Sequence, residues 1–169
     1  MSEPTPKSGA HTLEFRSGFL ALCGRPNVGK STLLNALLQT ELALATKFPQ
    51  TTRERMLGIW STDDFQAVLI DTPGIHRARS VLNKYMVSEA VRGASDADLV
   101  LLLAEVPRLP TDEAAEQWEP GESATAALQT LQDLGRPIAL VLTKVDRLTS
   151  RDHLLPIITR WQQLHTFHA

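Results

Sequence analysis

The segment that most constrains this chain is the octapeptide GRPNVGKS, residues Gly24–Ser31. It follows Phe19–Cys23, an apolar run of strand length, and precedes a stretch whose leucines recur at the helical period. Glycines in such a turn let consecutive backbone N–H groups surround an anion, and the start of the following helix adds the positive end of its dipole. The octapeptide matches the Walker A pattern in the strand-to-helix context that this pattern requires. It therefore predicts a phosphate-binding loop (P-loop) and an α/β fold.

The rest of the chain repeats this alternation of strands and helices. Further apolar runs of strand length lie at residues 56–61, 65–70, 99–103 and 138–142. The polar Thr62-Asp63-Asp64 separates the first two of these runs and predicts a hairpin, which would give one antiparallel edge strand in an otherwise parallel sheet. Strands that alternate with helices indicate a doubly wound sheet with helices on both faces, as in P-loop NTPases.

Helical periodicity predicts three helices beyond the one that follows the P-loop. The core-facing stripe of the first is expected to contain Leu82, Tyr85, Met86 and Ala90. Ser123 is expected to cap the next helix, which ends before Gly135. The last helix is expected over residues 152–164, with Pro156 in its first turn or at a kink. Residues 108–122 hold two prolines and five acidic residues, a composition that indicates a solvated surface loop.

Composition bears on the compartment and the class of partner of this protein. Lys and Arg number 17 against 19 Asp and Glu, so the net charge of −2 indicates no large basic surface for nucleic acid. The single Cys23 has no partner for an internal disulfide. Residues 1–18 are polar and are expected to form a disordered leader before a domain at 19–169. No apolar run reaches the length of about 18 residues that spans a membrane, so we expect a cytoplasmic location.

The tetrapeptide Asp71-Thr72-Pro73-Gly74 follows an apolar run that ends at Ile70. Because the carboxyl ends of parallel strands meet at one edge of a sheet, Asp71 is expected beside the P-loop. Its carboxylate and the hydroxyl of Ser31 would hold magnesium there, and the N–H of Gly74 would meet the γ-phosphate of a nucleotide. An isolated Asp-x-x-Gly is more often a plain turn, but the preceding Walker A unit favours the metal site.

A second polar segment, Thr143-Lys144-Val145-Asp146, stands at the end of the run 138–142. A carboxylate at Asp146 can accept hydrogen bonds from two adjacent N–H groups of guanine, and adenine offers no such pair on the corresponding edge. The segment therefore favours GTP over ATP. Related nucleotide-binding proteins more often begin this motif with Asn, so Thr143 is a departure.

Several stretches together resemble the Era GTPases, G domains of the TrmE-Era-EngA type. They are residues 24–38, 49–53 (PQTTR), 71–76 (DTPGIH), 82–86 (LNKYM) and 154–156 (LLP). The resemblance covers residues 17–165, and PQTTR is its most discriminating piece. It implies a Ras-like sheet whose last strand is missing from this chain. The guanine-contacting Ser-Ala loop and the KH domain that follow in Era proteins are likewise expected to be absent.

The resemblance also implies a function and its partners. Era proteins are GTPases of small ribosomal subunit assembly, so GTP, GDP and Mg²⁺ are the expected ligands, and 16S rRNA and the small subunit are the expected partners. Peripheral membrane association is a further family property. Thr52 is implied as the threonine that completes magnesium coordination, with Thr51 as its rival. Ile75 stands where Ras-like enzymes place a water-orienting glutamine, which implies slow hydrolysis, and Asn27 is implied to lie beside a potassium ion.

The expected site residues fall into three groups. Hydrolysis is assigned to Lys30, Thr52 and Gly74. Nucleotide contacts are assigned to Gly24, Arg25, Pro26, Asn27, Val28, Gly29, Lys30, Ser31, Thr32, Asp71, Thr72, Pro73, Gly74, Thr143, Lys144, Val145 and Asp146. Magnesium is assigned to Ser31, Thr52 and Asp71, and potassium to Asn27.

Two other classes of function stay open on the sequence alone. One is a truncated, non-catalytic module that binds nucleotide weakly or not at all, because the base-contacting loop is expected to be missing. The other is an adaptor-like interaction module whose loops at residues 45–53 and 74–79 dock a partner. The nearby His76 is expected to be a solvated loop histidine rather than a catalytic one.

Overall fold

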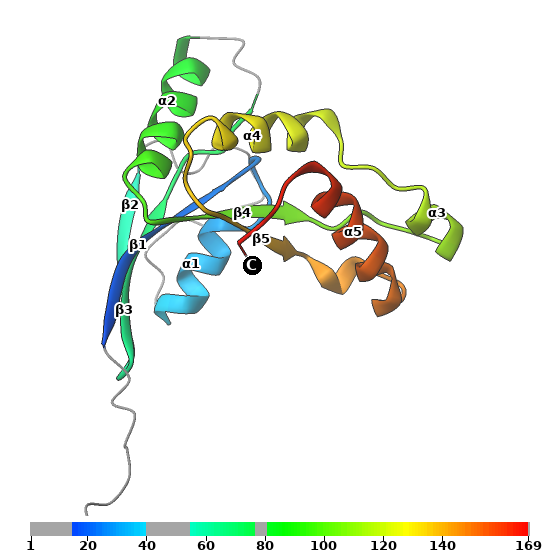
Figure 1. The fold of residues 1–169 in the computed structure, drawn as a ribbon, viewed down its shortest axis with the longest axis horizontal. Coiled ribbons are helices and arrows are strands. Elements are labelled where there is room, and N and C mark those ends of the chain that lie inside the picture. Colours follow the sequence, from blue (N-terminus) through cyan, green and yellow to red (C-terminus); the bar gives the residue numbers. More distant parts are fainter. Residues whose placement is uncertain (1–14, 40–54, 77–80, 169) are drawn as a thin grey trace, which may run out of the picture.

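The computed structural model describes residues 15–39, 55–76 and 81–168. Its strands form one sheet in the order β2-β3-β1-β4-β5 (Figure 1). The strands are β1 (Arg16–Gly24), β2 (Met56–Ser61), β3 (Phe65–Asp71), β4 (Leu99–Glu105) and β5 (Ile138–Thr143). Strand β2 runs antiparallel to β3, and all other neighbouring strands are parallel. The predicted mixed sheet with one antiparallel edge strand is therefore confirmed.

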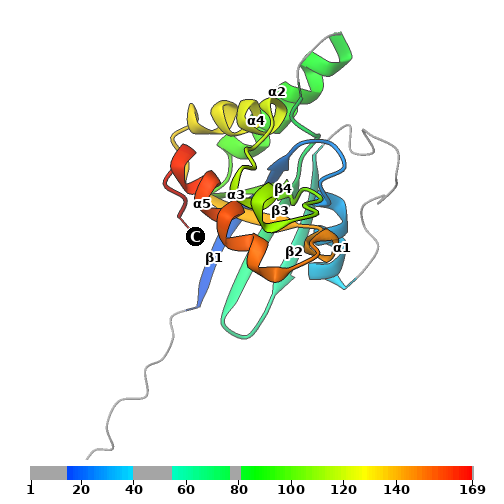
Figure 2. The same cartoon turned by 90° about the vertical axis from the view of Figure 1, so that its right-hand side faces the viewer.

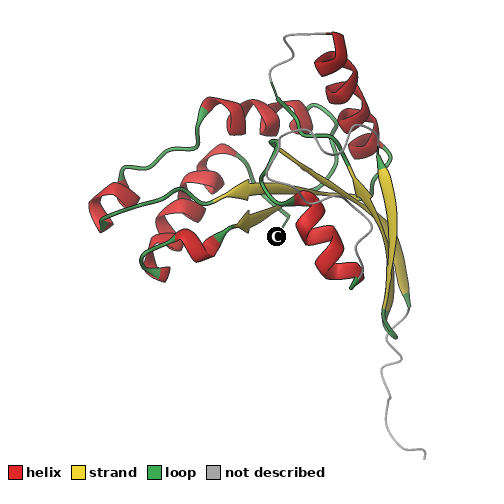
Figure 3. Cartoon of the chain, turned by 180° about the vertical axis from the view of Figure 1, so that it is seen from behind, coloured by secondary structure: helices red, strands yellow, loops and turns green. Residues whose placement is uncertain are grey.

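Helices cover both faces of this sheet. They are α1 (Lys30–Leu38), α2 (Val81–Ser95), α3 (Asp112–Glu116), α4 (Glu122–Gln132) and α5 (Leu154–Leu164), with single 3-10 turns η1 (Val145–Arg147) and η2 (Arg151–His153). Helix α1 lies on one face, and α2 and α4 lie on the other (Figures 1 and 2). Figure 3 shows that β4 and β5 point toward the side of the molecule that carries α3. Pro156 lies in the first turn of α5, as expected.

The carboxyl-terminal half of the central strand β1 is buried on both faces because each face has its own apolar cluster. Ala21 and Cys23 pack with α2, α4 and α5, and Leu22 packs with α1. All three side chains are fully buried. A nonpolar strand without polar alternation is what two-sided covering requires. This packing fixes the end of β1, where the P-loop begins.

The amino-terminal boundary of the domain differs from the expected one. Strand β1 begins at Arg16, so residues 16–18 belong to the sheet and not to a leader. The pairing with β3 continues back to Phe65, opposite Arg16, and the N–H of Arg16 donates to the carbonyl of Asp64 at 3.2 Å. Partner-strand hydrogen bonds thus extend the strand beyond its apolar run. Residues 1–14 lie outside the described residues.

The expected loop at residues 108–122 contains the short helix α3, so that expectation was wrong. Thr111 caps this helix by accepting a hydrogen bond from the N–H of Ala114. The helix packs against α5, where Arg160 donates to the carbonyl of Glu116 at 2.9 Å. Five residues are too few to produce a helical period in a sequence. The cap of α4 was also misplaced, because Gly121 and not Ser123 occupies the N-cap position.

The stripe expected for α2 is only half buried. Met86 and Ala90 are buried, but Leu82 and Tyr85 are 51% and 47% exposed. Figure 2 shows that one end of α2 extends beyond the sheet. The first turn of the helix therefore has no sheet to pack on, and the buried stripe continues toward Gly93 and Ala94 instead.

Strand β5 is an edge strand of the described sheet, as expected. The carboxyl-terminal residues turn back toward it, and the N–H of His168 donates to the carbonyl of Ile138 at 2.7 Å. Phe167 packs near this point against the cluster that contains Trp161. The start of the β5 edge is thus partly satisfied. Among the described helices, none combines the length and the apolar character needed to cross a bilayer.

Candidate nucleotide-binding site

The P-loop has backbone conformations that its sequence explains. Gly24 and Gly29 have φ values of 142° and 107°, and Asn27 adopts the left-handed region at 62°. A Cβ at position 24 would lie 2.4 Å from the carbonyl oxygen of Leu103, so only glycine fits there. These positive φ values turn the loop back on itself between β1 and α1. The result is the concave backbone that phosphate binding needs.

Lys30 is the first residue of α1 and extends into the P-loop. Its side chain is 7% exposed, and its ammonium group donates to the carbonyl of Arg25 at 3.0 Å. Burial lowers the pKa of this amine, and the nearby carboxylate of Asp71 acts against that shift. The loop carbonyls thus hold a cation at the centre of the concave backbone. A phosphate oxygen is a stronger partner for that cation than a carbonyl.

Two oxygen ligands meet where β3 ends beside the P-loop. The hydroxyl of Ser31 donates to the carboxylate of Asp71 at 3.0 Å. Asp71 is fully buried and is paired with Leu22 in the parallel register of β1 and β3. The next residue, Thr72, donates to the carbonyl of Leu22 at 2.7 Å and holds the strand end in place. One carboxylate and one hydroxyl fit Mg²⁺, which binds through few protein oxygens and the phosphates of a nucleotide.

The segment after Asp71 is docked on the P-loop. A Cβ at Gly74 would lie 2.7 Å from the backbone nitrogen of Pro26, and the N–H of Ile75 donates to the carbonyl of Gly24 at 2.9 Å. The side chain of Ile75 is buried. His76 contacts the carbonyl of Gly74 through Nδ1 at 2.8 Å, a bond within its own turn. A side chain without donors or acceptors at position 75 cannot orient a water molecule.

The segment that follows β5 is fastened to the P-loop from the other side. The hydroxyl of Thr143 donates to the carbonyl of Val28 at 2.6 Å. Lys144 adopts the left-handed conformation with φ 57° and donates to the carbonyl of Asn27. Asp146 lies in the turn η1 and is exposed. Its carboxylate is therefore available at the surface beside the P-loop.

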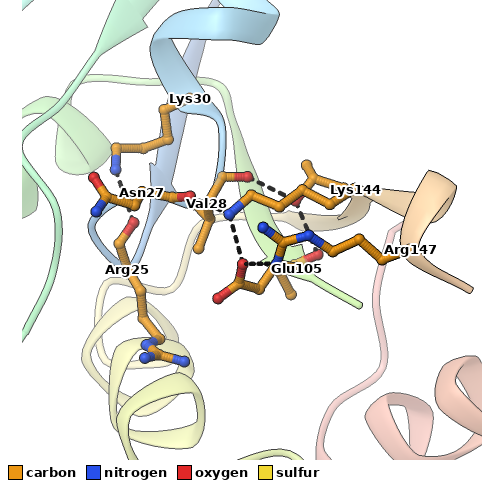
Figure 4. A network of polar contacts seen from close by, with 9 residues as sticks. Arg25, Asn27, Val28, Lys30, Glu105, Lys144 and Arg147 are labelled. Atoms are coloured by element: carbon orange, nitrogen blue, oxygen red, sulfur yellow. Dashed lines mark hydrogen bonds and ion pairs between the residues drawn. The ribbon is translucent and has the colours of Figure 1, made fainter. Parts of the chain in front are cut away.

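Glu105 is a member of this site that the sequence did not indicate. It is the last residue of β4, and its carboxylate accepts from Lys144 at 2.6 Å and from Arg147 at 3.0 Å (Figure 4). Burial alone would raise the pKa of this carboxyl, but the hydrogen bond and charge of Lys144, with Arg147 and Arg25, lower it. A lone glutamate at a strand end carries no signal in a sequence, since only the fold brings the two cations to it.

The structure brings most of the predicted site residues together at one edge of the sheet. The P-loop, Ser31, Asp71 and residues 143–146 are linked by the contacts described above. Thr32 is exposed on α1, and Pro73 is buried beside Gly74. Thr52 and its rival Thr51 lie outside the described residues. Within the described ranges, no group of three or more His, Cys, Asp or Glu side chains could hold a metal ion by itself.

The strand order, the P-loop and the two flanking segments define a P-loop domain of the guanine-nucleotide-binding class. Comparisons with known proteins agree. A family model described as "50S ribosome-binding GTPase" matches residues 19–144. GTPase Era of Syntrophus aciditrophicus is 40% identical over 160 residues, which are 95% of this chain and 49% of the relative. GTPase Era of Geobacter metallireducens is 43% identical over 153 residues, 90% of this chain and 48% of the relative.

Solved structures give the same result. An Era variant from Aquifex aeolicus bound to GDP and AlF4⁻ has a TM-score of 0.73 and 30% identity, with 88% of this chain and 48% of that chain covered. Era in complex with MgGDPNP and nucleotides 1506–1542 of 16S ribosomal RNA has a TM-score of 0.72 and 31% identity, with 90% and 48% covered. This chain therefore belongs to the family of the matching GTPase model, as an Era-type G domain. It spans about half the length of the relatives it matches.

Proposed function

We propose that this domain binds GTP and GDP with Mg²⁺ and hydrolyses GTP slowly. The observation that carries the proposal is the convergence of Lys30 and the Ser31–Asp71 pair on one concave loop. In this proposal the loop amides and Lys30 bind the β- and γ-phosphates, and Ser31 and Asp71 hold the metal. A bound Mg²⁺ would offset the negative charge of the phosphates. Lys30 then stabilises the charge that develops as water attacks the γ-phosphate in line.

Recognition of the base is assigned to Asp146. Its exposed carboxylate follows two residues that are bonded to the P-loop, Thr143 and Lys144. Because these bonds fix the distance between the phosphate loop and the base-reading loop, a nucleotide bound to one is positioned for the other. A carboxylate there accepts from the paired N–H groups of guanine and discriminates against adenine.

Slow turnover follows from the residues beside the expected γ-phosphate position. Ile75 is buried and apolar, so no side chain at this position orders the attacking water. Thr52, proposed to complete the Mg²⁺ coordination, and Asn27, proposed to lie beside potassium, would help to hold cations near the phosphates, and neither residue is a general base. Gly74, pressed against Pro26, is proposed to meet the γ-phosphate through its N–H. Phosphate release would then free this segment, which makes the domain a switch.

We further propose that the switch acts in assembly of the small ribosomal subunit in the cytoplasm. Support comes from Era, whose solved complex contains a segment of 16S ribosomal RNA. Because this chain spans about half of that protein, its own contact with RNA is a proposal that rests on family membership. Peripheral membrane association is likewise a proposal that rests on family membership.

The base assignment can be tested by competition against a fluorescent GDP analogue. GTP should displace the analogue far better than ATP, and Asp146→Asn should weaken GTP and strengthen xanthosine triphosphate, because an amide replaces one acceptor with a donor. Asp152→Asn is the matched control, since Asp152 is an exposed acid on η2 and should leave both affinities unchanged. Equal competition by GTP and ATP in the unmodified chain would show that Asp146 does not read guanine.

A further inference from the structure

A cavity of about 300 Å³ lies beside the P-loop, which contributes Arg25 and Val28 to its wall. Its walls come from the P-loop, the end of β4 with the residues that follow it, the start of α4, and α5. Lys30, Ser31, Asp71 and Asp146 do not line it. The volume is at the lower end of the range that holds small organic ligands, about 300–1,000 Å³.

The charged groups around this cavity are mostly cations. Arg25, Arg108 and Arg147 line it, against the single carboxylate of Glu105. Glu105 is already bonded to Arg147 and to Lys144, at 3.0 and 2.6 Å. This excess of positive charge is local, because the chain as a whole has a net charge of −2.

Two of these arginines keep their hydrogen-bonding capacity. Within the part of the chain that the structure describes, the guanidinium groups of Arg25 and Arg108 have no hydrogen-bond or ion-pair partner. In Figure 4 the guanidinium of Arg25 points away from the ammonium group of Lys30. Arg25 thus belongs to the P-loop through its backbone and lines the cavity with its side chain.

The cavity wall also contains a buried donor without a partner among the described residues. Trp161 is 2% exposed, and its indole N–H has no acceptor among the described residues. Helix α4 begins at this wall, where the N–H of Ala124 is already bonded to the carbonyl of Gly121 at 2.8 Å. The rest of the lining is largely apolar and includes Trp118 and Val106. A wall with free donors and an apolar floor fits a ligand that carries acceptors on an apolar body.

We propose that this cavity is a second ligand site, which binds a small organic anion with one carboxylate or phosphate group on an apolar body. The anionic group lies between Arg25 and Arg108, and the apolar body contacts Trp118 and Trp161. This site goes beyond the nucleotide site and does not depend on GTP binding for its existence.

The three tryptophans of the chain give a direct test on the nucleotide-free protein. Sodium benzoate is titrated while the indole N–H signals are followed by NMR, with Trp60→Phe and Trp118→Phe used to assign them. Trp118 and Trp161 should shift together and saturate, and Trp60, which is on β2, should not shift. Benzamide, which has the same ring without the charge, and acetate, which has the charge without the ring, should each bind at least about tenfold more weakly.

A variant isolates the proposed anion contact. Arg108→Gln should weaken benzoate about tenfold or more, because a charge-assisted hydrogen bond is lost. Arg108 is exposed, so its replacement should leave the fold intact, which the unchanged signal of Trp60 checks. Arg151→Gln removes an exposed arginine that does not line the cavity and should not alter binding. The proposal is overturned by absent saturation at Trp161, by equal binding of benzamide, or by unchanged binding in Arg108→Gln.

Discussion

The hydrogen bond from Thr143 to the P-loop offers a precise perturbation of the site. Its hydroxyl donates to the carbonyl of Val28 at 2.6 Å, across 115 residues of sequence. Val has nearly the shape of Thr, so Thr143→Val removes the hydroxyl and leaves the packing almost unchanged. The carbonyl of Val28 then loses a partner in a partly buried position.

The size of the effect follows from that geometry. A typical hydrogen bond contributes about 0.5–1.5 kcal/mol, and a buried acceptor left without a partner costs about 1–3 kcal/mol. For this partly buried carbonyl we expect the free energy of unfolding to fall by about 1–2 kcal/mol. A change of 1 kcal/mol lowers the melting temperature by about 2–4 °C in a domain of this size. If the loss of this hydrogen bond also displaces the P-loop, GDP affinity should drop by about tenfold.

Urea unfolding followed by circular dichroism measures the first quantity, and titration with a fluorescent GDP analogue measures the second. Thr159→Val is the matched control, because its hydroxyl donates to the carbonyl of Leu155 on the exposed surface of α5. That control should change stability by less than about 0.5 kcal/mol. Thr143→Asn should recover much of the loss, because its amide can also donate to Val28. Unchanged stability and GDP affinity in Thr143→Val would refute the view that this bond holds the P-loop.

Three further predictions follow from other contacts of the site. Ser31→Ala and Asp71→Ala should weaken nucleotide binding in the presence of Mg²⁺ more than in EDTA; equal losses in both conditions would count against the metal assignment. Burial raises the pKa of Cys23 to about 11, so iodoacetamide at pH 8 should label this thiol only in the unfolded chain, as mass spectrometry would detect. Glu105→Gln should cost about 1 kcal/mol or less at pH 7. The pKa of Glu105 is lowered in the folded state, so the difference in free energy of unfolding between the two proteins should shrink as the pH falls through that pKa. Urea titrations at several pH values measure this difference, and a constant value would contradict the reasoning.

The sequence predicted the sheet well because each strand has a local signal. Runs such as 99–103 and 138–142 are apolar throughout, as strands covered on both faces must be. The hairpin was predictable from the polar residues between β2 and β3. The start of β1 was not, since Arg16 joins the sheet through backbone hydrogen bonds that any side chain allows.

The sequence predicted those site residues that belong to a motif. It did not predict those that only tertiary contacts bring to the site. Only glycine fits at position 24, because a Cβ there would clash with the carbonyl oxygen of Leu103, and the Walker A pattern has a glycine at this position. Glu105 has no motif, because its two cations come from elsewhere in the chain. Thr can replace the more common Asn at position 143, because its hydroxyl donates a hydrogen bond to the carbonyl of Val28.

The acidic residues of the segment 108–122 show how a correct compositional statement can miss a structural consequence. The segment is acidic, and two of its carboxylates are paired with residues that do not line the cavity: Asp112 contacts His153 at 2.7 Å, and Glu119 contacts Arg160 at 3.3 Å. These contacts join the segment to η2 and α5, and the segment supplies Arg108 and Trp118 to the cavity wall. None of the five carboxylates lines the cavity, and none forms an ion pair with Arg25 or Arg108 within the described residues. A segment with five acidic residues therefore contributes to the wall of a cavity with an excess of positive charge, which its sequence alone would not indicate.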